Sequence, residues 1–179
     1  MPSKKLEQAT FGGGCFWCLE AIFTDLAGVE QVLPGYSGGT VPNPSYELVC
    51  TDTTNHAEVV QITYDPAVIT YAELLDVFFS IHDPTTLNRQ GEDVGTQYRS
   101  VIFYHNQEQK DAAEKAVLAH QQYWADPIVT EVVPLREFYA AEDYHREYFR
   151  YHPDQSYCRL VINPKVQSFR AKFKDRLKK

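Results

Sequence analysis

The sequence LEQATFGGGCFWCLEAIFTDL, residues 6–26, predicts a strand, a glycine turn and a helix in that order. Residues 6–11 read as a short strand that runs into residues 12–14, which are all glycine. Residues 18–26 then space their apolar side chains as a helix does, and Gly28 ends the pattern. Because three glycines let the backbone turn tightly, we expect the turn to place Cys15 at the start of the helix.

The rest of the chain continues this alternation of strands and helices. The strands are expected at residues 29–36, 58–64, 100–105 and 129–133, and the helices at 70–81 and 107–124. Thr70 is the expected N-cap of the first of these helices, with Glu73 at its N3 position. A stretch dense in glycine and proline, residues 34–44, is expected to be a loop that is either functional or loose.

The order βαββαβ predicts the fold class. We expect an α+β fold, namely a two-layer α/β plait of the split βαβ (ferredoxin-like) type. Helical material near residues 142–149 and 165–177 adds C-terminal helices and an irregular tail.

Length and composition limit the class of protein. A chain of 179 residues fits a single catalytic domain, which we place at residues 1–179 with its core at about 6–173. No apolar stretch is long enough to span a bilayer and none follows residues 1–5, so we expect neither membrane insertion nor secretion but a cytoplasmic protein. Seventeen basic against 24 acidic residues give a formal charge of −7, which disfavours nucleic-acid binding.

The four cysteines are Cys15, Cys18, Cys50 and Cys158. Without an export signal they are expected to be reduced, and to serve catalysis or metal binding rather than a disulfide framework. The helix dipole is expected to acidify the thiol of Cys15, and the thiolate is the nucleophilic form. The aromatic residues Phe16 and Trp17 follow directly, and an exposed aromatic wall beside a reactive sulfur indicates an apolar substrate group.

Other interpretations of this segment remain open at this point. Cys15, Phe16 and Trp17 could be ordinary core residues. Cys15 and Cys18 supply two zinc ligands, although a closed site needs two more and no second Cys-x-x-Cys pair occurs. The same pair at a helix start is also typical of thioredoxin-like redox proteins. A zinc- or redox-sensing binding module and a thiol peroxidase or disulfide reductase are therefore the alternatives to weigh.

Six motifs along the chain resemble the peptide methionine sulfoxide reductase family, type A. They are GCFW at 14–17, GYSGG at 35–39, NPSY at 43–46, HAE at 56–58, HDPT at 82–85 and GTQYRS at 95–100. The resemblance extends from about residue 8 to residue 173, with the motifs in the family's order. Asn55 departs from the glycine that commonly precedes HAE, although asparagine tolerates the left-handed backbone conformation better than most residues.

This resemblance implies a thiol-dependent reduction of the S epimer of methionine sulfoxide, free or in proteins, that repairs oxidative damage. Cys15 would become a sulfenic acid, and no metal, flavin or nicotinamide cofactor would be bound. The sulfoxide oxygen leaves only when it is protonated, so an acid must lie near it. Glu58 matches the family's proton donor, and a carboxyl held protonated in a poorly solvated pocket could serve.

The resemblance also assigns the residues around the sulfoxide. Tyr46 and Tyr98 match the tyrosines whose hydroxyls hydrogen-bond the sulfoxide oxygen. Phe16 and Trp17 match the apolar cage for the S-methyl group. Asp93 matches an acidic residue that orders the site through water.

The sulfenic acid on Cys15 needs a second thiol, and two candidates exist. Cys158 matches the C-terminal recycling cysteine of many relatives, on a segment that could swing, and the resemblance favours it. Cys18 lies one helical turn from Cys15, within disulfide reach only if that turn relaxes. The resulting disulfide would be reduced by thioredoxin. Cys50 matches a cysteine without an assigned role and is expected to be buried.

Overall fold

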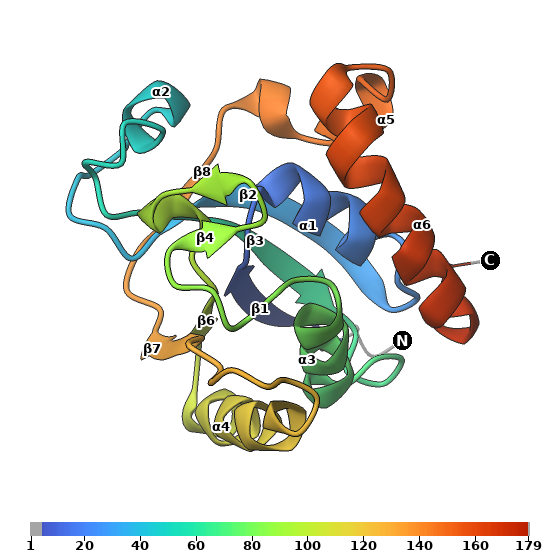
Figure 1. The fold of residues 1–179 in the computed structure, drawn as a ribbon. Coiled ribbons are helices and arrows are strands. Elements are labelled where there is room, and N and C mark those ends of the chain that lie inside the picture. The colour runs from blue at the N-terminus through green and yellow to red at the C-terminus, as the bar shows by residue number, and fades with distance from the viewer. Residues whose placement is uncertain (1–4, 179) are drawn as a thin grey trace.

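The computed structural model describes residues 5–178, which form a mixed α/β structure (Figure 1). Six strands of this part of the chain make one sheet in the order β7-β6-β1-β3-β2-β8. Their bounds are β1 Glu7–Gly12, β2 Val29–Ser37, β3 Ala57–Tyr64, β6 Val101–Tyr104, β7 Glu131–Pro134 and β8 Phe138–Ala140. The sheet is mixed, because β6 and β7 are parallel and the other neighbours are antiparallel.

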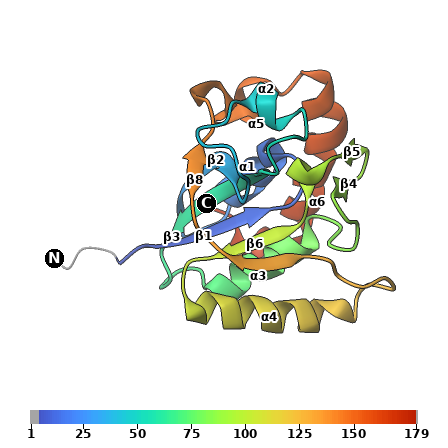
Figure 2. The same cartoon turned by 90° about the vertical axis from the view of Figure 1, so that its left-hand side faces the viewer.

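The helices lie around this sheet and at one end of it. They are α1 Phe16–Thr24, α2 Tyr46–Val49, α3 Tyr71–Ser80, α4 Gln107–Gln121, α5 Tyr148–Tyr151 and α6 Asn163–Lys172. Figure 2 shows α2 and α5 at the end of the molecule opposite α4. A small two-stranded sheet of β4 (Arg89–Gln90) and β5 (Asp93–Val94) lies between α3 and a short 3-10 helix at Thr96–Tyr98 in the sequence.

Strand β3 shows how the sheet separates two cores. Side chains alternate between the faces of a strand, so Val60, Ile62 and Tyr64 enter the larger core, which also contains residues of α1 and α3. Val59 enters a smaller cluster on the opposite face. Glu58 has the parity of the first set, so its carboxyl belongs to the helix-covered face and is buried there.

The helix predictions are confirmed with small shifts in their bounds. Thr70 is the N-cap of α3, and its hydroxyl oxygen accepts a hydrogen bond from the Glu73 backbone N–H at 3.1 Å. Helix α1 begins two residues earlier than predicted, because its first turn starts directly after Cys15. Helix α4 ends at Gln121 rather than at 124.

The C-terminal part contains helices, as predicted, and is less irregular than predicted. A π-helical turn at Cys158–Ile162 continues directly into α6, and a 3-10 turn follows at Lys174–Arg176. The short elements α2, β4, β5 and β8 were not predicted, because segments of two to four residues show no periodicity.

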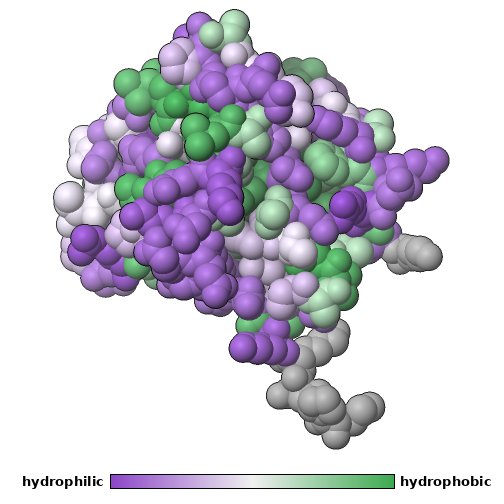
Figure 3. Space-filling view, turned by 90° about the horizontal axis from the view of Figure 1, so that it is seen from below, coloured by the Kyte–Doolittle hydropathy of each residue, from purple (hydrophilic) through white to green (hydrophobic). Residues whose placement is uncertain are grey.

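The surface seen from below is mostly hydrophilic, with smaller hydrophobic patches between the polar side chains (Figure 3). No helix within residues 5–178 is long and apolar enough to cross a membrane.

Candidate active site

The glycine turn fixes the position of Cys15. Gly14 has a φ of +89°, and its N–H donates a hydrogen bond of 3.2 Å to the carbonyl of Tyr98. A Cβ at Gly14 would lie 2.9 Å from Cγ of Gln90, so both the backbone angle and the packing require glycine. Cys15 follows as the N-cap of α1, and its carbonyl accepts the Cys18 N–H at 3.1 Å.

Glu58 is a buried carboxyl next to this helix start. Its side chain extends from β3, and its Oε1 accepts the Phe16 backbone N–H at 3.2 Å. Its Oε2 is buried and has no hydrogen-bond partner among the described residues. Burial raises the pKa of Glu58 to about 8, against the opposing effect of the Phe16 N–H and with a further increase from Asp93. At neutral pH this carboxyl is therefore mainly protonated.

The prediction that the helix dipole acidifies Cys15 is wrong for the site without substrate. Burial is the largest effect and raises the pKa of the Cys15 thiol well above its ordinary value, and the charge of Glu58 raises it further. The backbone N–H of Trp17, at the helix start, lowers this pKa but is outweighed. Because Glu58 is mainly protonated and uncharged at pH 7, it contributes little to the raised pKa of Cys15 at that pH.

Tyr46 and Tyr98 lie beside Glu58, although they are distant in sequence. Tyr46 is the first residue of α2. Tyr98 is the last residue of the 3-10 helix, and its own carbonyl accepts the Gly14 N–H. Burial raises the pKa of both phenols, and the charge of Glu58 is the second cause for each. Both hydroxyls therefore keep their protons and can donate hydrogen bonds.

The aromatic wall differs from the prediction in its exposure. Phe16 is fully buried in the core, whereas Trp17 is half-buried. The ring of Tyr46 lies 6.2 Å from each of theirs in a stacked orientation. The apolar surface of the site is thus formed by Trp17 and Tyr46, with Phe16 behind them.

Asp93 lies in the site, and its partner is a residue that sequence analysis did not identify. The Tyr157 hydroxyl donates a hydrogen bond of 2.5 Å to Oδ2 of Asp93. The charges of Cys15 and Asp93 contribute to an increase in the pKa of Tyr157, after burial as the largest cause. The adjacent Cys158 could have served as a signal, because it is the predicted recycling cysteine.

The other three cysteines lie in different environments. Cys18 is buried in the first turn of α1, and burial raises its pKa to about 11, although the charge of Lys165 lowers it. Cys158 is fully buried in the π-helical turn, and burial raises its pKa. Cys50 is exposed at the C-terminus of α2, so the prediction that it is buried is wrong. Helix α2 has four residues and buries only Val49, which leaves Cys50, the C-cap that follows it, at the surface.

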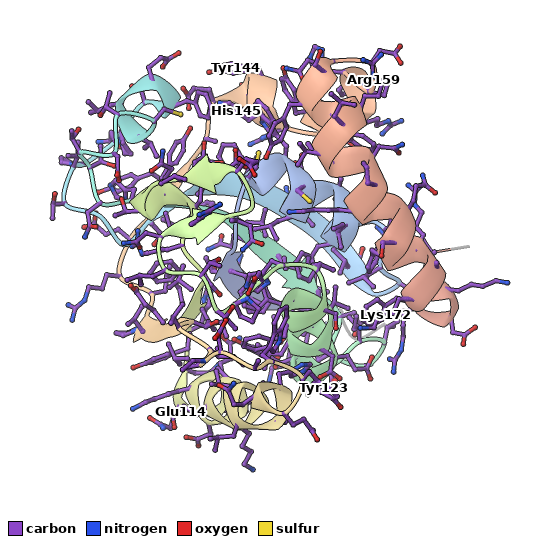
Figure 4. The ribbon with its side chains drawn as sticks, viewed as in Figure 1. Glu114, Tyr123, Tyr144, His145, Arg159 and Lys172 are labelled. Atoms are coloured by element: carbon purple, nitrogen blue, oxygen red, sulfur yellow. The ribbon has the colours of Figure 1, made fainter. Side chains whose placement is uncertain are left out.

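Residues from the C-terminal part of the chain contact Trp17 and Tyr46 and hold them in place. The Trp17 indole N–H donates to Nδ1 of His145 at 2.9 Å, and Trp17 stacks on the ring of Tyr148 at 3.8 Å and 7°. Glu142 accepts both the Tyr36 hydroxyl and the Tyr46 backbone N–H at 2.9 Å. Figure 4 shows the segment with Tyr144 and His145 between α2 and α5. The only sequence signal for this role is the high proportion of aromatic residues within residues 144–157.

The HAE loop accommodates its departure from the family pattern. Asn55 adopts a φ of +61°, the left-handed conformation expected of the glycine that it replaces. Within residues 5–178, no group of three or more His, Cys, Asp or Glu side chains could hold a metal ion. The zinc interpretation of Cys15 and Cys18 therefore lacks further ligands in this part of the chain.

Comparison with known sequences gives matches over nearly the whole chain. The model of the peptide methionine sulfoxide reductase family matches residues 7–177. The peptide methionine sulfoxide reductase MsrA of Sulfolobus acidocaldarius is 59% identical over 171 residues, which cover 96% of this chain and 97% of that protein. The MsrA of Leptospira borgpetersenii is 56% identical over 164 residues, which cover 92% and 93%.

Solved structures give the same result. Methionine sulfoxide reductase A of Corynebacterium diphtheriae has a TM-score of 0.81 and 37% identity, covering 84% of this chain and 77% of that one. Reduced Mxr1 of Saccharomyces cerevisiae has a TM-score of 0.79 and 38% identity, covering 86% and 90%. Mxr1 in complex with Trx2 has a TM-score of 0.57 and 28% identity, covering 82% and 87%. These matches to sequence and structure, together with a thiol and a protonated carboxyl at one helix start, establish that the chain belongs to the peptide methionine sulfoxide reductase family.

Proposed function

We propose that this enzyme reduces the S epimer of methionine sulfoxide, free or in proteins, with Cys15 as nucleophile and Glu58 as proton donor. The observation that carries the proposal is the pairing of these two groups at the start of α1. Glu58 has one oxygen on the Phe16 N–H and one buried oxygen without a partner among the described residues. The second oxygen can carry the proton that the sulfoxide needs.

The chemical step is balanced by one proton. The Cys15 sulfur attacks the sulfoxide sulfur while Glu58 gives its proton to the sulfoxide oxygen, and the thiol proton replaces the one that Glu58 gave. The attack forms a bond between the two sulfurs. The hydroxyl then moves from the methionine sulfur to the Cys15 sulfur as that bond breaks, which leaves a sulfenic acid on Cys15 and methionine as the thioether. Cys15 is oxidised by two electrons and the substrate sulfur is reduced by two.

The surrounding residues hold the sulfoxide for this step. Tyr46 and Tyr98 would donate hydrogen bonds to the oxygen, since both phenols stay protonated beside Glu58. Trp17 and Phe16 would hold the S-methyl group against an apolar surface. Asp93, which Tyr157 fixes through its hydroxyl, would order water at the edge of the site.

The second thiol converts the sulfenic acid into a disulfide and releases water. Cys18 is supported by its position, because the N-cap and N3 residues of a helix lie on the same turn and Cys18 raises the pKa of Cys15 through space. Cys158 is supported by its neighbour Tyr157, which reaches Asp93, but it is buried in a π-helical turn that must open first. We propose that Cys18 attacks the sulfenic acid first, which gives a disulfide between Cys15 and Cys18. Cys158 then enters a second disulfide by thiol–disulfide exchange.

Thioredoxin is the proposed reductant of the final disulfide. The structure of Mxr1 with Trx2 supports this partner for a relative. Thioredoxin would give two electrons and two protons, which regenerate both thiols of the enzyme.

The test is turnover of the two separated epimers of a methionine sulfoxide peptide with a dithiol reductant. The S epimer should be consumed, and the R epimer should persist under the same conditions. Cys15→Ser should form no methionine in the same assay, while its circular dichroism spectrum stays that of the wild type. Equal turnover of both epimers, or methionine formation by Cys15→Ser, would contradict the proposal.

We also propose that the four central strands are the predicted plait of split βαβ type. The order β6-β1-β3-β2 and the antiparallel pairing of these strands support it. The edge strands β7 and β8 extend that arrangement on either side.

A further inference from the structure

One buried carboxyl in this structure has no part in the proposed reaction. Glu20 lies on α1, three residues after Trp17, and its side chain is packed against the C-terminal part of the chain. Only 3% of the residue is exposed. Its Oε1 accepts the backbone N–H of Glu147 at 2.6 Å, a contact between positions 127 residues apart in the sequence. A buried carboxyl requires such partners, because burial without them is costly.

Glu147 is in a strained backbone conformation. Its φ of +52° and ψ of +35° lie in the left-handed region, which costs a residue other than glycine or asparagine about 1 kcal/mol or more. It directly precedes α5, and its own side chain makes no capping hydrogen bond. The first N–H groups of α5 therefore need an acceptor from elsewhere, and the Tyr148 N–H is close enough to the Glu20 carboxyl to lower its pKa.

The two residues that hold Trp17 flank this strained position. His145 accepts the indole N–H of Trp17, and Tyr148 stacks on the indole face. Because only two residues separate them, the turn at Glu147 determines whether both can contact the indole at once. A turn that relaxed to ordinary backbone angles would move at least one ring away.

The charged side chains around Glu20 lie at the start of α5 and where the C-terminus of α1 meets α6. The carboxylate of Glu147, which pairs with Arg150 at 3.0 Å, raises the pKa of Glu20, and the charge of Arg146 lowers it. At the far end of α1, Asp25 pairs with Arg170 of α6 at 2.9 Å. Glu20 itself has no arginine or lysine within ion-pair distance among the described residues, so its partners are backbone N–H groups.

We propose that Glu20 is a positioning residue, whose carboxylate holds the left-handed turn at Glu147 so that His145 and Tyr148 clamp the indole of Trp17. The consequence for the reaction rests on the proposed role of Trp17 in binding the S-methyl group. Glu20 touches neither the substrate nor the reacting sulfur, and acts through the indole.

The test follows the Trp17 indole directly. Trp17 and Trp124 are the two tryptophans of the chain, so a Trp124→Phe background leaves Trp17 as the sole emitter. In that background we compare Glu20→Gln and Glu20→Ala, and measure emission together with KM and the single-turnover rate for a methionine sulfoxide peptide. The control is Asp25→Asn, which removes a carboxyl at the C-terminus of the same helix, where its ion-pair partner is Arg170 of α6 and not a residue of α5.

Glu20→Ala should shift the Trp17 emission to longer wavelength and raise KM about ten-fold, the scale expected for losing a charge-assisted hydrogen bond that positions a binding residue. Glu20→Gln should give a smaller change in both, because its amide oxygen still accepts a hydrogen bond. The single-turnover rate at saturating peptide should fall less than KM rises. Asp25→Asn should behave like the background protein.

A pH titration supplies a readout that a merely structural residue would not move. Burial raises the pKa of Glu20 to about 7, with a further increase from Glu147 and decreases from the N–H groups and Arg146. The Trp17 emission should therefore change with a midpoint near pH 7, and this change should vanish in Glu20→Gln. His145 and Glu58 still titrate in Glu20→Gln. The change in emission that disappears in this variant is therefore the one caused by Glu20.

Wild-type emission and wild-type KM in Glu20→Ala would overturn the proposal. A lower melting temperature without a change in emission or KM would also overturn it, because Glu20 would then serve stability alone. Should Glu20→Ala fail to fold, Glu20→Gln and the titration decide. Failure of the proposed function is seen separately in Trp17→Phe. If that variant keeps its KM, the cage role of Trp17 is wrong, while the emission of Trp17 in the Glu20 variants still tests the clamp.

Discussion

At the scale of single residues, the burial of Glu58 makes stability depend on pH. Its pKa rises from 4.5 to about 8 on folding, so the folded state binds this proton more tightly than the unfolded state. The contribution is full below pH 4.5 and is lost as the pH rises to 8. Glu58→Gln should lack this slope, which is about 1.4 kcal/mol per pH unit inside the window.

Urea unfolding of both proteins between pH 5 and pH 9 measures this difference. The stability of wild type relative to Glu58→Gln should decrease toward pH 8 and then level off. Glu20 also titrates in this range but is common to both proteins. A constant difference across the range would mean that Glu58 keeps an ordinary pKa in the folded state.

The two tyrosine hydroxyls should matter for rate rather than for folding. Tyr46→Phe and Tyr98→Phe should each slow methionine formation about 10- to 100-fold, because each removes a donor to the oxygen on which charge changes in the reaction. Single-turnover experiments at saturating substrate measure the effect. An unchanged rate in either variant would remove that tyrosine from the proposed set.

At the scale of elements, the glycine turn between β1 and α1 is constrained both by its backbone angle and by packing. Gly14→Ala combines a left-handed backbone with a Cβ 2.9 Å from Gln90, and should cost about 2–3 kcal/mol of unfolding free energy. Gly91→Ala is the matched control, because Gly91 has a φ of +59° and open space around its Cβ position. It should cost about 1 kcal/mol. Equal costs in urea unfolding would show that the contact with Gln90 is unimportant.

The elements with clear periodicity were predictable from sequence, and the short ones were not. Residues 70–81 combine an N-cap with helical spacing, and α3 follows them closely. Helix α2 has four residues and depends on Ser45 capping and on Glu142 binding the Tyr46 N–H. That second contact spans 96 residues, and no local pattern encodes it.

The same reason explains what sequence analysis missed in the site. Cys15 and Glu58 lie in recognisable motifs, whereas His145, Tyr148 and Tyr157 join the site only because α5 folds back onto α1. The lowered pKa expected of Cys15 was wrong because burial and a neighbouring carboxyl outweigh the helix start. Neither effect is visible until the strand that carries Glu58 is placed.

At the scale of the whole molecule, the account includes a disulfide exchange with Cys158, which is fully buried in the π-helical turn before α6. After one equivalent of substrate, peptide mapping of wild type should find Cys18 in the first disulfide and Cys158 in a later one. Cys158→Ser should still release one methionine per enzyme but lose steady-state turnover with thioredoxin. A first disulfide between Cys15 and Cys158 would contradict this order, and one that contains Cys50 would exclude both candidates.

The central claim is that Glu58 supplies the proton to the sulfoxide oxygen while Cys15 attacks. The most direct measurement is the single-turnover rate of methionine formation by Glu58→Gln between pH 5 and pH 9. The control is Glu92→Gln, which makes the same change at an exposed glutamate that precedes Asp93 in the sequence. The account predicts a rate about 10²-fold or more below wild type, without recovery at low pH, and a wild-type rate for the control. A wild-type rate in Glu58→Gln would contradict it.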